Sequence, residues 1–458
     1  MNDITAFFAF LKYCLGYKEN MSRVIAGMNW HALYSFASKQ ALLGLCFEGI
    51  ERLGEEYPEE LKRNPIGREV LMIWMGKAQQ IRRQNMKVNA VASKLFSMLR
   101  EDGMRCCVLK GQGNALMYPN PYSRTPGDID VWIDASRERI TEYASKRFEL
   151  EDDFRLQHLE TSLDGVPVEL HFFPCSMNNP IYHARLQKWF RRNADLQCSH
   201  IVGLPDEAGD IAIPTTAFNV VYQLTHLYHH FFDEGIGMRQ IIDYFLVVND
   251  FSKNVFLNND LSNHPVNFSN HPVPLSKEGS TFSPSPSSSG SGDVTAPSRC
   301  SEPLRSKDGG PSKVSPDCAG WDRLAIEGDN SAGSTTVVTS SASTALVVVQ
   351  RELKYLGLWK FAGAVMYVLH EALGLPEEKM IAPMDEKRGK LLLAEILNGG
   401  NFGRHFTKYG HFTQQGMAKK YFLKIWRNMH FVRYFPAEAL SEPIFRTWHF
   451  FWRLKHRR

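Results

Sequence analysis

Apolar residues recur at helical spacing through most of the first hundred positions. The segments FASKQALLGLCFEGIERL and VNAVASKLFSMLRED place apolar side chains three and four positions apart, which favours amphipathic helices. Gly103 follows the second segment, at a position where a glycine commonly ends a helix. The pattern predicts an N-terminal helical lobe over residues 1–100.

The period changes between Arg105 and Phe173. Short runs typical of β-strands (RCCVLKG, GDIDVWID, FRLQHLETSL and VPVELHFF) surround one helical stretch near SRERITEYASKRF. This alternation predicts a small mixed-sheet core over residues 101–175. Because helical spacing returns after Pro174, we expect an α+β protein whose core is flanked by N- and C-terminal helical lobes.

A segment of different composition interrupts the C-terminal lobe. Residues 251–345 contain SPSPSSSGSG, KDGGPSK and SAGSTTVVTSSAST, which are rich in Ser, Pro and Gly. Such a segment buries too little apolar surface to offset the entropy lost on ordering, so we predict a disordered insertion. Helical spacing resumes at LVVVQRELKYLGLWKF, and the insertion therefore divides one helical lobe into residues 176–250 and 346–458.

Composition limits the classes of protein that this chain can belong to. Its 458 residues are 43% hydrophobic and 12% aromatic, which is enough for the packed cores of two or three domains. The 53 basic and 49 acidic residues leave a net charge of only +4. Because a dedicated nucleic-acid binder carries a dense basic field, nucleic acid is not indicated as a partner.

Cysteine usage and hydropathy bear on location. The eight cysteines form no CxxC pair, a pattern that suits free thiols in a reducing cytoplasm. The N-terminal MNDITAFFAFLKYCLG lacks the basic region and the sustained apolar core of a secretory signal. Since no stretch approaches about 18 uninterrupted apolar residues, we expect a cytoplasmic protein without a membrane span.

Two aspartates in GDIDVWID form the strongest candidate site. On a strand, Asp128 and Asp130 project to one face and the apolar residues between and after them project to the other. The two carboxylates then lie ~7 Å apart on one surface. Carboxylates held this close repel each other unless a cation lies between them, and oxygen ligands of this kind suit magnesium or manganese.

A third carboxylate follows in a predicted hairpin. HLETSL and VPVELHF flank Asp164-Gly165, a dipeptide that favours a tight two-residue turn with positive backbone angles. Glu169 and His171 then face one way on the second strand. If this strand lies beside the GDID strand, Glu169 joins the two aspartates. Pro167 cannot donate to a strand ladder, so it favours an edge position or the start of the strand.

A glycine turn precedes these acidic residues. Residues 108–114, VLKGQGN, have the pattern of a strand that enters a turn and then a short helix. Gly111 at such a turn lets backbone amides approach an anion such as phosphate. Lys110 is either a phosphate ligand or a charged residue that protects a strand edge.

Together these motifs resemble a known fold. A glycine turn, then a GD-apolar-D strand, then a later strand with one acidic residue resembles the nucleotidyltransferase superfamily of DNA polymerase beta. The segments LKG, PYSR, GDIDVWID, ELHFFP, HLYHHF and GIGMRQIID are similar to the uncharacterised bacterial nucleotidyltransferase family (NTP_transf_5). The turn departs from the superfamily pattern of Gly followed by Ser or Gly, because Gln112 follows Gly111. Lys110 or Gln112 would then contact the phosphate.

The resemblance implies a metal-dependent nucleotidyltransferase. It would use Mg²⁺ or Mn²⁺ to move a nucleoside monophosphate from a nucleoside triphosphate to an unknown small-molecule or macromolecular acceptor. Asp128, Asp130 and Glu169 would be the catalytic metal ligands, and Glu169 would also help to deprotonate the acceptor hydroxyl. The implied nucleotide-binding residues are Lys110, Gly111, Gln112, Arg124 and Gly127, and the implied substrate-binding residues are His171, His226 and Arg239.

Several of these residues have alternative explanations. His226, His229 and His230 have a helical spacing that also suits zinc, although we favour a cluster that partly faces the cleft and partly packs. Arg239 is spaced from Asp243 for an ordinary helical ion pair. His171 is equally consistent with a core or rim histidine.

Two other functions remain open at this stage. The chain is alternatively a catalytically inactive nucleotide-binding or partner-binding protein of a regulatory or antitoxin-like kind, as the altered turn after Gly111 and the long insertion suggest. A weaker alternative is a hydrolase that uses the same carboxylates. The acceptor, the preferred nucleotide and the oligomeric state do not follow from the sequence.

Overall fold

A four-stranded mixed sheet forms the core of the computed structural model, which describes residues 3–150, 155–257, 342–405 and 417–456. The strand order is β1-β2-β4-β3. β2 is antiparallel to β1 and parallel to β4, and β4 is antiparallel to β3. The strands are β1 (Cys106–Leu109), β2 (Ile129–Ile133), β3 (His158–Leu163) and β4 (Val166–His171). The predicted α+β fold with a small mixed sheet is confirmed.

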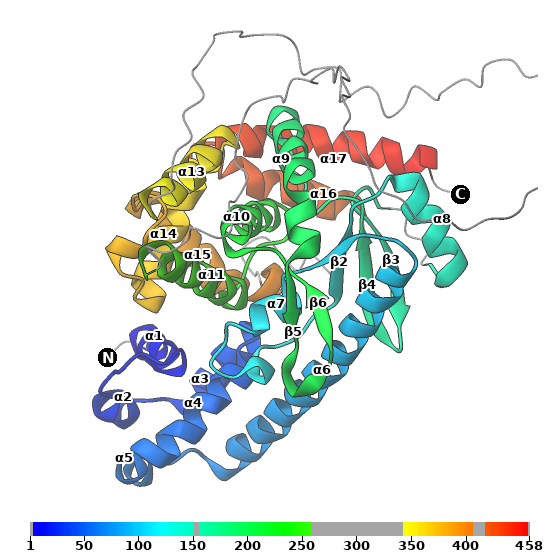
Figure 1. Cartoon of the computed structure of the whole chain (residues 1–458). Coiled ribbons are helices and arrows are strands. Elements are labelled where there is room, and N and C mark those ends of the chain that lie inside the picture. The colour runs from blue at the N-terminus through cyan, green and yellow to red at the C-terminus, as the bar shows by residue number, and fades with distance from the viewer. Residues whose placement is uncertain (1–2, 151–154, 258–341, 406–416, 457–458) are drawn as a thin grey trace, which may run out of the picture. The chain divides into compact units, whose positions relative to one another are not determined.

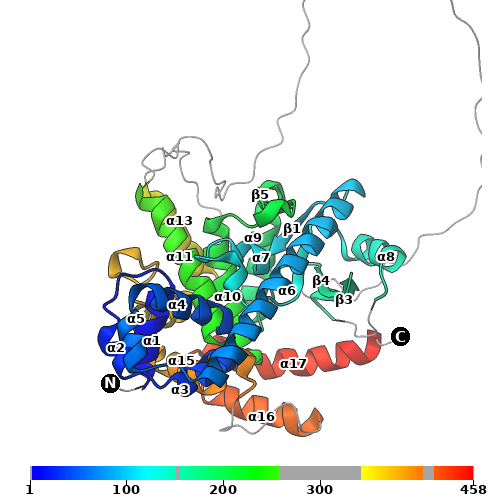
Figure 2. The same ribbon diagram turned by 90° about the horizontal axis from the view of Figure 1, so that it is seen from below.

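In the part of the chain that the structure describes, six helices precede the sheet, as the apolar spacing predicts. The last of them, α6, has 34 residues and runs beside the sheet (Figures 1 and 2). Its buried residues Val91, Leu95 and Leu99 recur every four positions and pack into one apolar cluster with the strands. The helices are α1 (Asp3–Cys14), α2 (Ser22–Ala26), α3 (Trp30–Lys39), α4 (Leu43–Glu56), α5 (Pro58–Arg63) and α6 (Arg68–Glu101).

The two faces of the sheet differ in chemistry. Ile129, Val131 and Leu170 face the apolar cluster shared with α6. The opposite face carries Asp130 and Glu169, which lie side by side in the β2–β4 register. Connecting elements at the strand ends are α7 (Gly111–Ala115), η1 (Pro121–Ser123) and α8 (Arg137–Arg147).

The remaining helices share a second, larger apolar cluster with the N-terminal helices and with Trp132 on the polar face of the sheet. Trp132 of β2 stacks on Phe218, which stacks on Trp189, with ring centroids 6.1 and 4.6 Å apart. This aromatic contact joins the sheet to the helices. The elements are α9 (Pro180–Ser199), α10 (Thr216–Asp233), α11 (Met238–Leu257), α13 (Ala342–Tyr355), α14 (Trp359–Leu373), η4 (Glu377–Lys379), α15 (Glu386–Gly399), η5 (Asn401–Gly403), α16 (Met417–Met429) and α17 (Pro436–His456).

A small hairpin after Pro174 was not expected from the sequence, which indicated that helices dominate there. β5 (Ile201–Gly203) and β6 (Asp210–Ala212) pair as a separate two-stranded sheet around η2 (Pro205–Glu207), and β6 packs against α6 and β1. Each strand has three residues. An alternation of apolar and polar residues over so short a run cannot be distinguished from a helical pattern.

The boundaries of the interrupting segment also differ from those expected. α11 continues to Leu257 and α13 begins at Ala342, so both ends of the segment expected at 251–345 are helical. α13 packs against both α10 and α11, which places the two flanks in one helical lobe. The predicted insertion otherwise falls on residues 258–341, which lie outside the described residues. The residue ranges assigned to the lobes stay a prediction.

Among the residues that the structure describes, no helix combines the length and the apolar character needed to cross a bilayer.

Candidate active site

Three carboxylates meet on the polar face of the sheet. Asp130 lies directly opposite Glu169 in the parallel β2–β4 register, and Asp128 lies immediately before β2. All three line one cleft with a volume of about 460 Å³, within the size range of small-molecule sites. The structure therefore brings together the residues that the sequence groups, although Asp128 precedes the strand instead of lying on it.

The hairpin that supplies Glu169 forms as expected. Asp164 and Gly165 have φ angles of +50° and +70°, the positive pair that a tight two-residue hairpin turn requires. Pro167 lies near the start of β4 and precedes Val168, the first residue that pairs with β2. Its missing N–H therefore removes no bond to β2, which explains how a central strand tolerates a proline.

Like charges crowd this face of the sheet. Glu160 of β3 lies opposite Glu169, so Asp130, Glu169 and Glu160 form one row across three strands. Asp130's charge, followed by loss of hydration, raises the pKa of Asp128 to about 6. Carboxylates directly opposite one another are destabilising, so the row requires nearby cations.

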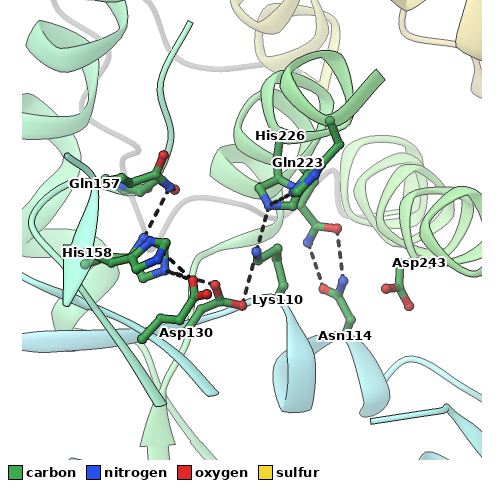
Figure 3. A network of polar contacts seen from close by, with 12 residues as sticks. Lys110, Asn114, Asp130, Gln157, His158, Gln223, His226 and Asp243 are labelled. Carbon is green, nitrogen blue, oxygen red and sulfur yellow. Dashed lines mark hydrogen bonds and ion pairs between the residues drawn. The ribbon is translucent and has the colours of Figure 1, made fainter. Parts of the chain in front are cut away.

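Lys110 supplies one of these cations. Its Nζ lies 3.1 Å from Asp130 Oδ2 and 2.8 Å from His226 Nε2, and Figure 3 shows it between the two. Burial is the main cause, and the charge of Lys110 the second, that holds the pKa of His226 well below its usual range. The neutral imidazole therefore accepts a hydrogen bond from the Lys110 ammonium. Lys110 thus faces the cleft and links the sheet to α10.

His171 supplies a second positive group. Its Nε2 lies 3.0 Å from Asp130 Oδ1 and 3.1 Å from Glu169 Oε2. Burial opposes the charged form, but these hydrogen bonds raise the pKa of His171 to about 9. The same bonds, together with Lys110, outweigh burial and lower the pKa of Asp130. His171 therefore fixes the two carboxylates in place.

His158 was not identified from the sequence. It lies opposite His171 in the β3–β4 register, with ring centroids 4.9 Å apart. Burial, followed by the charge of His171, lowers the pKa of His158 to about 4, so its ring is neutral. Its position two residues before Glu160 mirrors Glu169 and His171 across the predicted turn, and this symmetry is a signal that the sequence contained.

The histidines of α10 also line the cleft. His226, His229 and His230 are all among its lining residues, and His226 Nε2 lies 3.0 Å from His230 Nε2. Among the described residues, the histidine-containing group that could hold a metal is instead His158, Glu169 and His171. The geometry thus favours a cleft-facing cluster on α10 over a zinc site there.

Two arginines occupy the end of the cleft near Gly127. Arg124 Nε and Nη2 donate to both carboxylate oxygens of Asp243, at 2.9 and 2.8 Å. Arg239 donates to the Thr125 carbonyl at 3.0 Å. Asp243 therefore forms its hydrogen-bonded ion pair with Arg124, 119 residues away in the sequence, and the nearby charge of Arg239 acts on Asp243 without a hydrogen bond between their side chains. The sequence suggested that Arg124 forms bidentate bonds with a triphosphate. In the structure, Arg124 forms such bonds with Asp243.

Gln112 corrects another expectation. Its side chain is buried and donates to Asn89 of α6, and it is not among the residues that line the cleft. The helical turn that begins at Gly111 directs this residue inward, toward α6. Gly111 and Gly127 do line the cleft, so the backbone there is open to a ligand.

Further lining residues come from segments that carry no recognisable motif. They lie just before β3, at its polar face, and near η5: Arg155, Gln157, Glu160, Phe402 and Arg404. Phe402 lies 5.6 Å from the Arg239 guanidinium, measured to its ring centroid. Because η5 is far from the core motifs in sequence, only the tertiary structure brings it to the cleft.

Comparisons with known proteins bear on this arrangement. The model of a family described as uncharacterised nucleotidyltransferase matches residues 26–262, which include the sheet and the α10 histidines. The crystal structure of an antigenic nucleotidyltransferase-like protein from Paracoccidioides brasiliensis matches with 18% identity and a TM-score of 0.25, over 35% of this chain and 75% of that chain. No curated protein matches the chain.

Proposed function

Because this chain belongs to the uncharacterised nucleotidyltransferase family, we propose that it moves a nucleoside monophosphate from a nucleoside triphosphate to an acceptor, using divalent cations. The single observation that carries the proposal is the register of Asp130 against Glu169. With Asp128 next to them at the same cleft, three carboxylates converge beside a glycine turn. Convergent carboxylates next to a phosphate-accessible backbone are what two-metal transfer requires.

The donor set fits magnesium or manganese. Asp128, Asp130 and Glu169 offer only oxygen ligands, which these ions prefer. The raised pKa of Asp128, caused first by the charge of Asp130, indicates negative charge that the neighbouring lysine and histidine do not fully balance. When bound, the cations would activate the acceptor oxygen and neutralise the leaving pyrophosphate.

The chain's own groups have distinct roles in this proposal. Lys110 Nζ lies 3.1 Å from Asp130 Oδ2 and would contact the triphosphate. Arg239 lines the cleft, and its buried Nε has no hydrogen-bond partner within the described part of the chain, which makes it a second phosphate ligand. Glu169 would receive the acceptor proton, while His171 holds its carboxylate in position.

The assay for this function is transfer of α-labelled nucleotide. The full-length protein would be incubated with each α-³²P nucleoside triphosphate, magnesium or manganese, and a cell extract as the source of acceptors. We expect labelled product and release of pyrophosphate. Asp128→Asn and Asp130→Asn should each lower the rate at least about 100-fold, because each removes a metal-binding charge.

A matched control uses the same chemical change elsewhere. Asp164→Asn alters an exposed turn residue whose carboxylate pairs with Lys94, and asparagine tolerates its positive φ. This variant should retain the native rate. Equal rates in native protein, Asp128→Asn and Asp130→Asn would reject the assignment of the site.

One observation favours an alternative, a catalytically inactive protein that binds nucleotides. Gln112 contacts Asn89, so its side chain offers no polar contact to a phosphate at the Gly111 turn. Calorimetry with magnesium and each triphosphate separates the two functions: binding without labelled product or pyrophosphate favours the alternative. A hydrolase would release inorganic products without labelling any acceptor.

We place the reaction in the cytoplasm. Among the described residues the cysteines are free, and most are buried (Cys14, Cys46, Cys106, Cys107 and Cys175), as expected under reducing conditions. Fractionation of cells that produce the protein would test this location.

A further inference from the structure

The row of residues next to the carboxylates contains two imidazoles. His158 and His171 face each other across β3 and β4, and Glu160 and Glu169 form the next pair in the same register. HLE on one strand therefore mirrors ELH on the other. All four side chains line the cleft, so this edge of the site combines nitrogen and oxygen donors.

Three of these residues lie at distances that suit one cation. One donor atom from each of His158, Glu169 and His171 lies within 4.8 Å of the other two. Glu169 Oε2 lies 3.4 Å from His158 Nδ1 and 3.1 Å from His171 Nε2. Ligands about 2.1 Å from a tetrahedral ion are separated by roughly 3.4 Å, so small movements complete such a site.

His158 provides an independent observation. The residue is 8% exposed, and neither ring nitrogen has a hydrogen-bond partner within the described part of the chain, although Nε2 lies 3.6 Å from Glu160 Oε1. Burying the ring nitrogens without hydrogen bonds is unfavourable, and such a group in a native protein calls for a ligand. Its Nδ1 faces Glu169.

The surroundings of His171 suit metal binding as well. The side-chain amide of Gln157 lies 3.3 Å from His171 Nδ1 and is itself held by the Pro174 carbonyl, 3.1 Å away. Ligating histidines commonly place the second ring nitrogen against such a polar group, which orients the ring. A half-turn of the Gln157 amide, which breaks its bond to the Pro174 carbonyl, lets the amide oxygen accept a hydrogen bond from the N–H at His171 Nδ1.

We propose that His158, Glu169 and His171 form a binding site for a divalent transition-metal ion of the class represented by Zn²⁺, Co²⁺ and Mn²⁺. Imidazole ligands select these ions over Mg²⁺, which prefers oxygen. The inference deepens the proposed function, because Glu169 is shared with the carboxylate site formed with Asp128 and Asp130. It does not require that the protein catalyse a reaction.

Cobalt is the probe for this site. The full-length protein, stripped with a chelator, would be titrated with Co²⁺ while visible absorption is recorded. We expect a saturable band at one equivalent that Zn²⁺ displaces and excess Mg²⁺ does not. His158→Gln and His171→Gln should each weaken Co²⁺ binding by at least about tenfold. His31→Gln is the matched control, because His31 is exposed on α3, and it should bind as the native protein does.

A second measurement keeps the test valid if the variants fold poorly. X-ray absorption on the zinc-loaded native protein should give the scattering of two imidazole ligands. The inference is wrong if native protein gives no saturable cobalt band, if His158→Gln binds Co²⁺ as tightly as native protein, or if bound zinc has no imidazole ligands.

Asp128→Asn separates this inference from the proposed function. Asp128 is not a ligand of the imidazole site, so the variant should lose nucleotide transfer and keep cobalt binding. Cobalt binding in a native protein without transferase activity would reject the proposed function alone. Transferase activity without a cobalt band would reject the inference alone.

Discussion

Lys110 has a backbone conformation that residues with side chains rarely adopt. Its φ and ψ are +50° and −125° at the start of α7. Such strain costs on the order of 1–3 kcal/mol and is concentrated at functional sites. In this conformation the Lys110 ammonium contacts Asp130 and His226, and these contacts offset the strain.

Substitution of Lys110 can separate backbone strain from charge. Lys110→Gly and Lys110→Ala both remove the ammonium, but only glycine adopts this φ and ψ freely. We expect Lys110→Gly to have a free energy of unfolding about 1 kcal/mol higher than that of Lys110→Ala, as measured by chemical denaturation. Lys87→Gly and Lys87→Ala, at an exposed position of α6, should give the opposite order, because alanine favours helix. The same order at both sites would contradict the assignment of strain.

At the scale of elements, α4 approaches η1 through a glycine. A Cβ added at Gly44 would lie 2.2 Å from the backbone oxygen of Ser123, so Gly44→Ala must displace η1. We expect a loss of roughly 1–3 kcal/mol in unfolding free energy. Gly76 on α6 has no atom within 4 Å of an added Cβ, so Gly76→Ala should stabilise by up to about 1 kcal/mol. Thermal unfolding of both variants measures this contrast; a stabilised Gly44→Ala would be inconsistent with the close packing.

A buried glutamate joins α17 to the start of α9. Glu438 is fully buried and accepts the Asn178 and Asn179 amides at 2.6 and 3.3 Å. Burial outweighs these bonds and raises the pKa of Glu438 to about 7 from its usual 4.5. The folded protein therefore holds a proton that the unfolded chain releases between these two pH values, and stability falls as pH rises through this window.

Glu438→Gln should remove this pH dependence. At about 1.4 kcal/mol per pKa unit, the unfolding free energy of native protein should fall by roughly 3 kcal/mol more than that of the variant between pH 4.5 and 8. Denaturation curves at both pH values provide the comparison, with Glu377→Gln, at an exposed position, as the control. Parallel pH profiles for native protein and Glu438→Gln would exclude the raised pKa.

At the scale of the whole molecule, a buried ion pair joins the segment before β2 to α11 of the helical lobe. Arg124 and Asp243 are both 5% exposed and form two hydrogen bonds, and Tyr118 donates a third to Asp243 at 2.8 Å. The pair orients the segment that leads to Asp128. Removing one charge leaves the other buried without compensation, which costs about 3–5 kcal/mol.

A double-mutant cycle tests the coupling between the core and the lobe. Arg124→Met and Asp243→Ala should each be strongly destabilising, and the combination should cost less than their sum by up to about 3 kcal/mol. Unfolding free energies of the four proteins give the coupling term. Strict additivity would mean that the two side chains act independently.

Local sequence signals accounted for the elements and for part of the candidate site. Apolar spacing indicated the long helices, and Asp164-Gly165 indicated the turn because positive φ angles at both positions restrict the residue types. Alternation placed Asp130 on the polar face of its strand. These are properties of neighbouring residues, so the sequence alone contains them.

Other features depend on residues far apart in the chain. Gln112 turns toward Asn89 and Arg124 pairs with Asp243, because the most favourable partner for a buried polar group is set by packing. His158 belongs to the site only because β3 pairs with β4 in one register.

The sequence by itself determined the α+β organisation and which carboxylates and glycine could act together. The tertiary structure decided which cation neutralises each carboxylate, which arginine pairs with Asp243, and which two imidazoles face Glu169. The reason is physical: secondary structure follows from short-range periodicity, whereas the energy of a buried charge depends on every group that folding brings within a few ångströms of it.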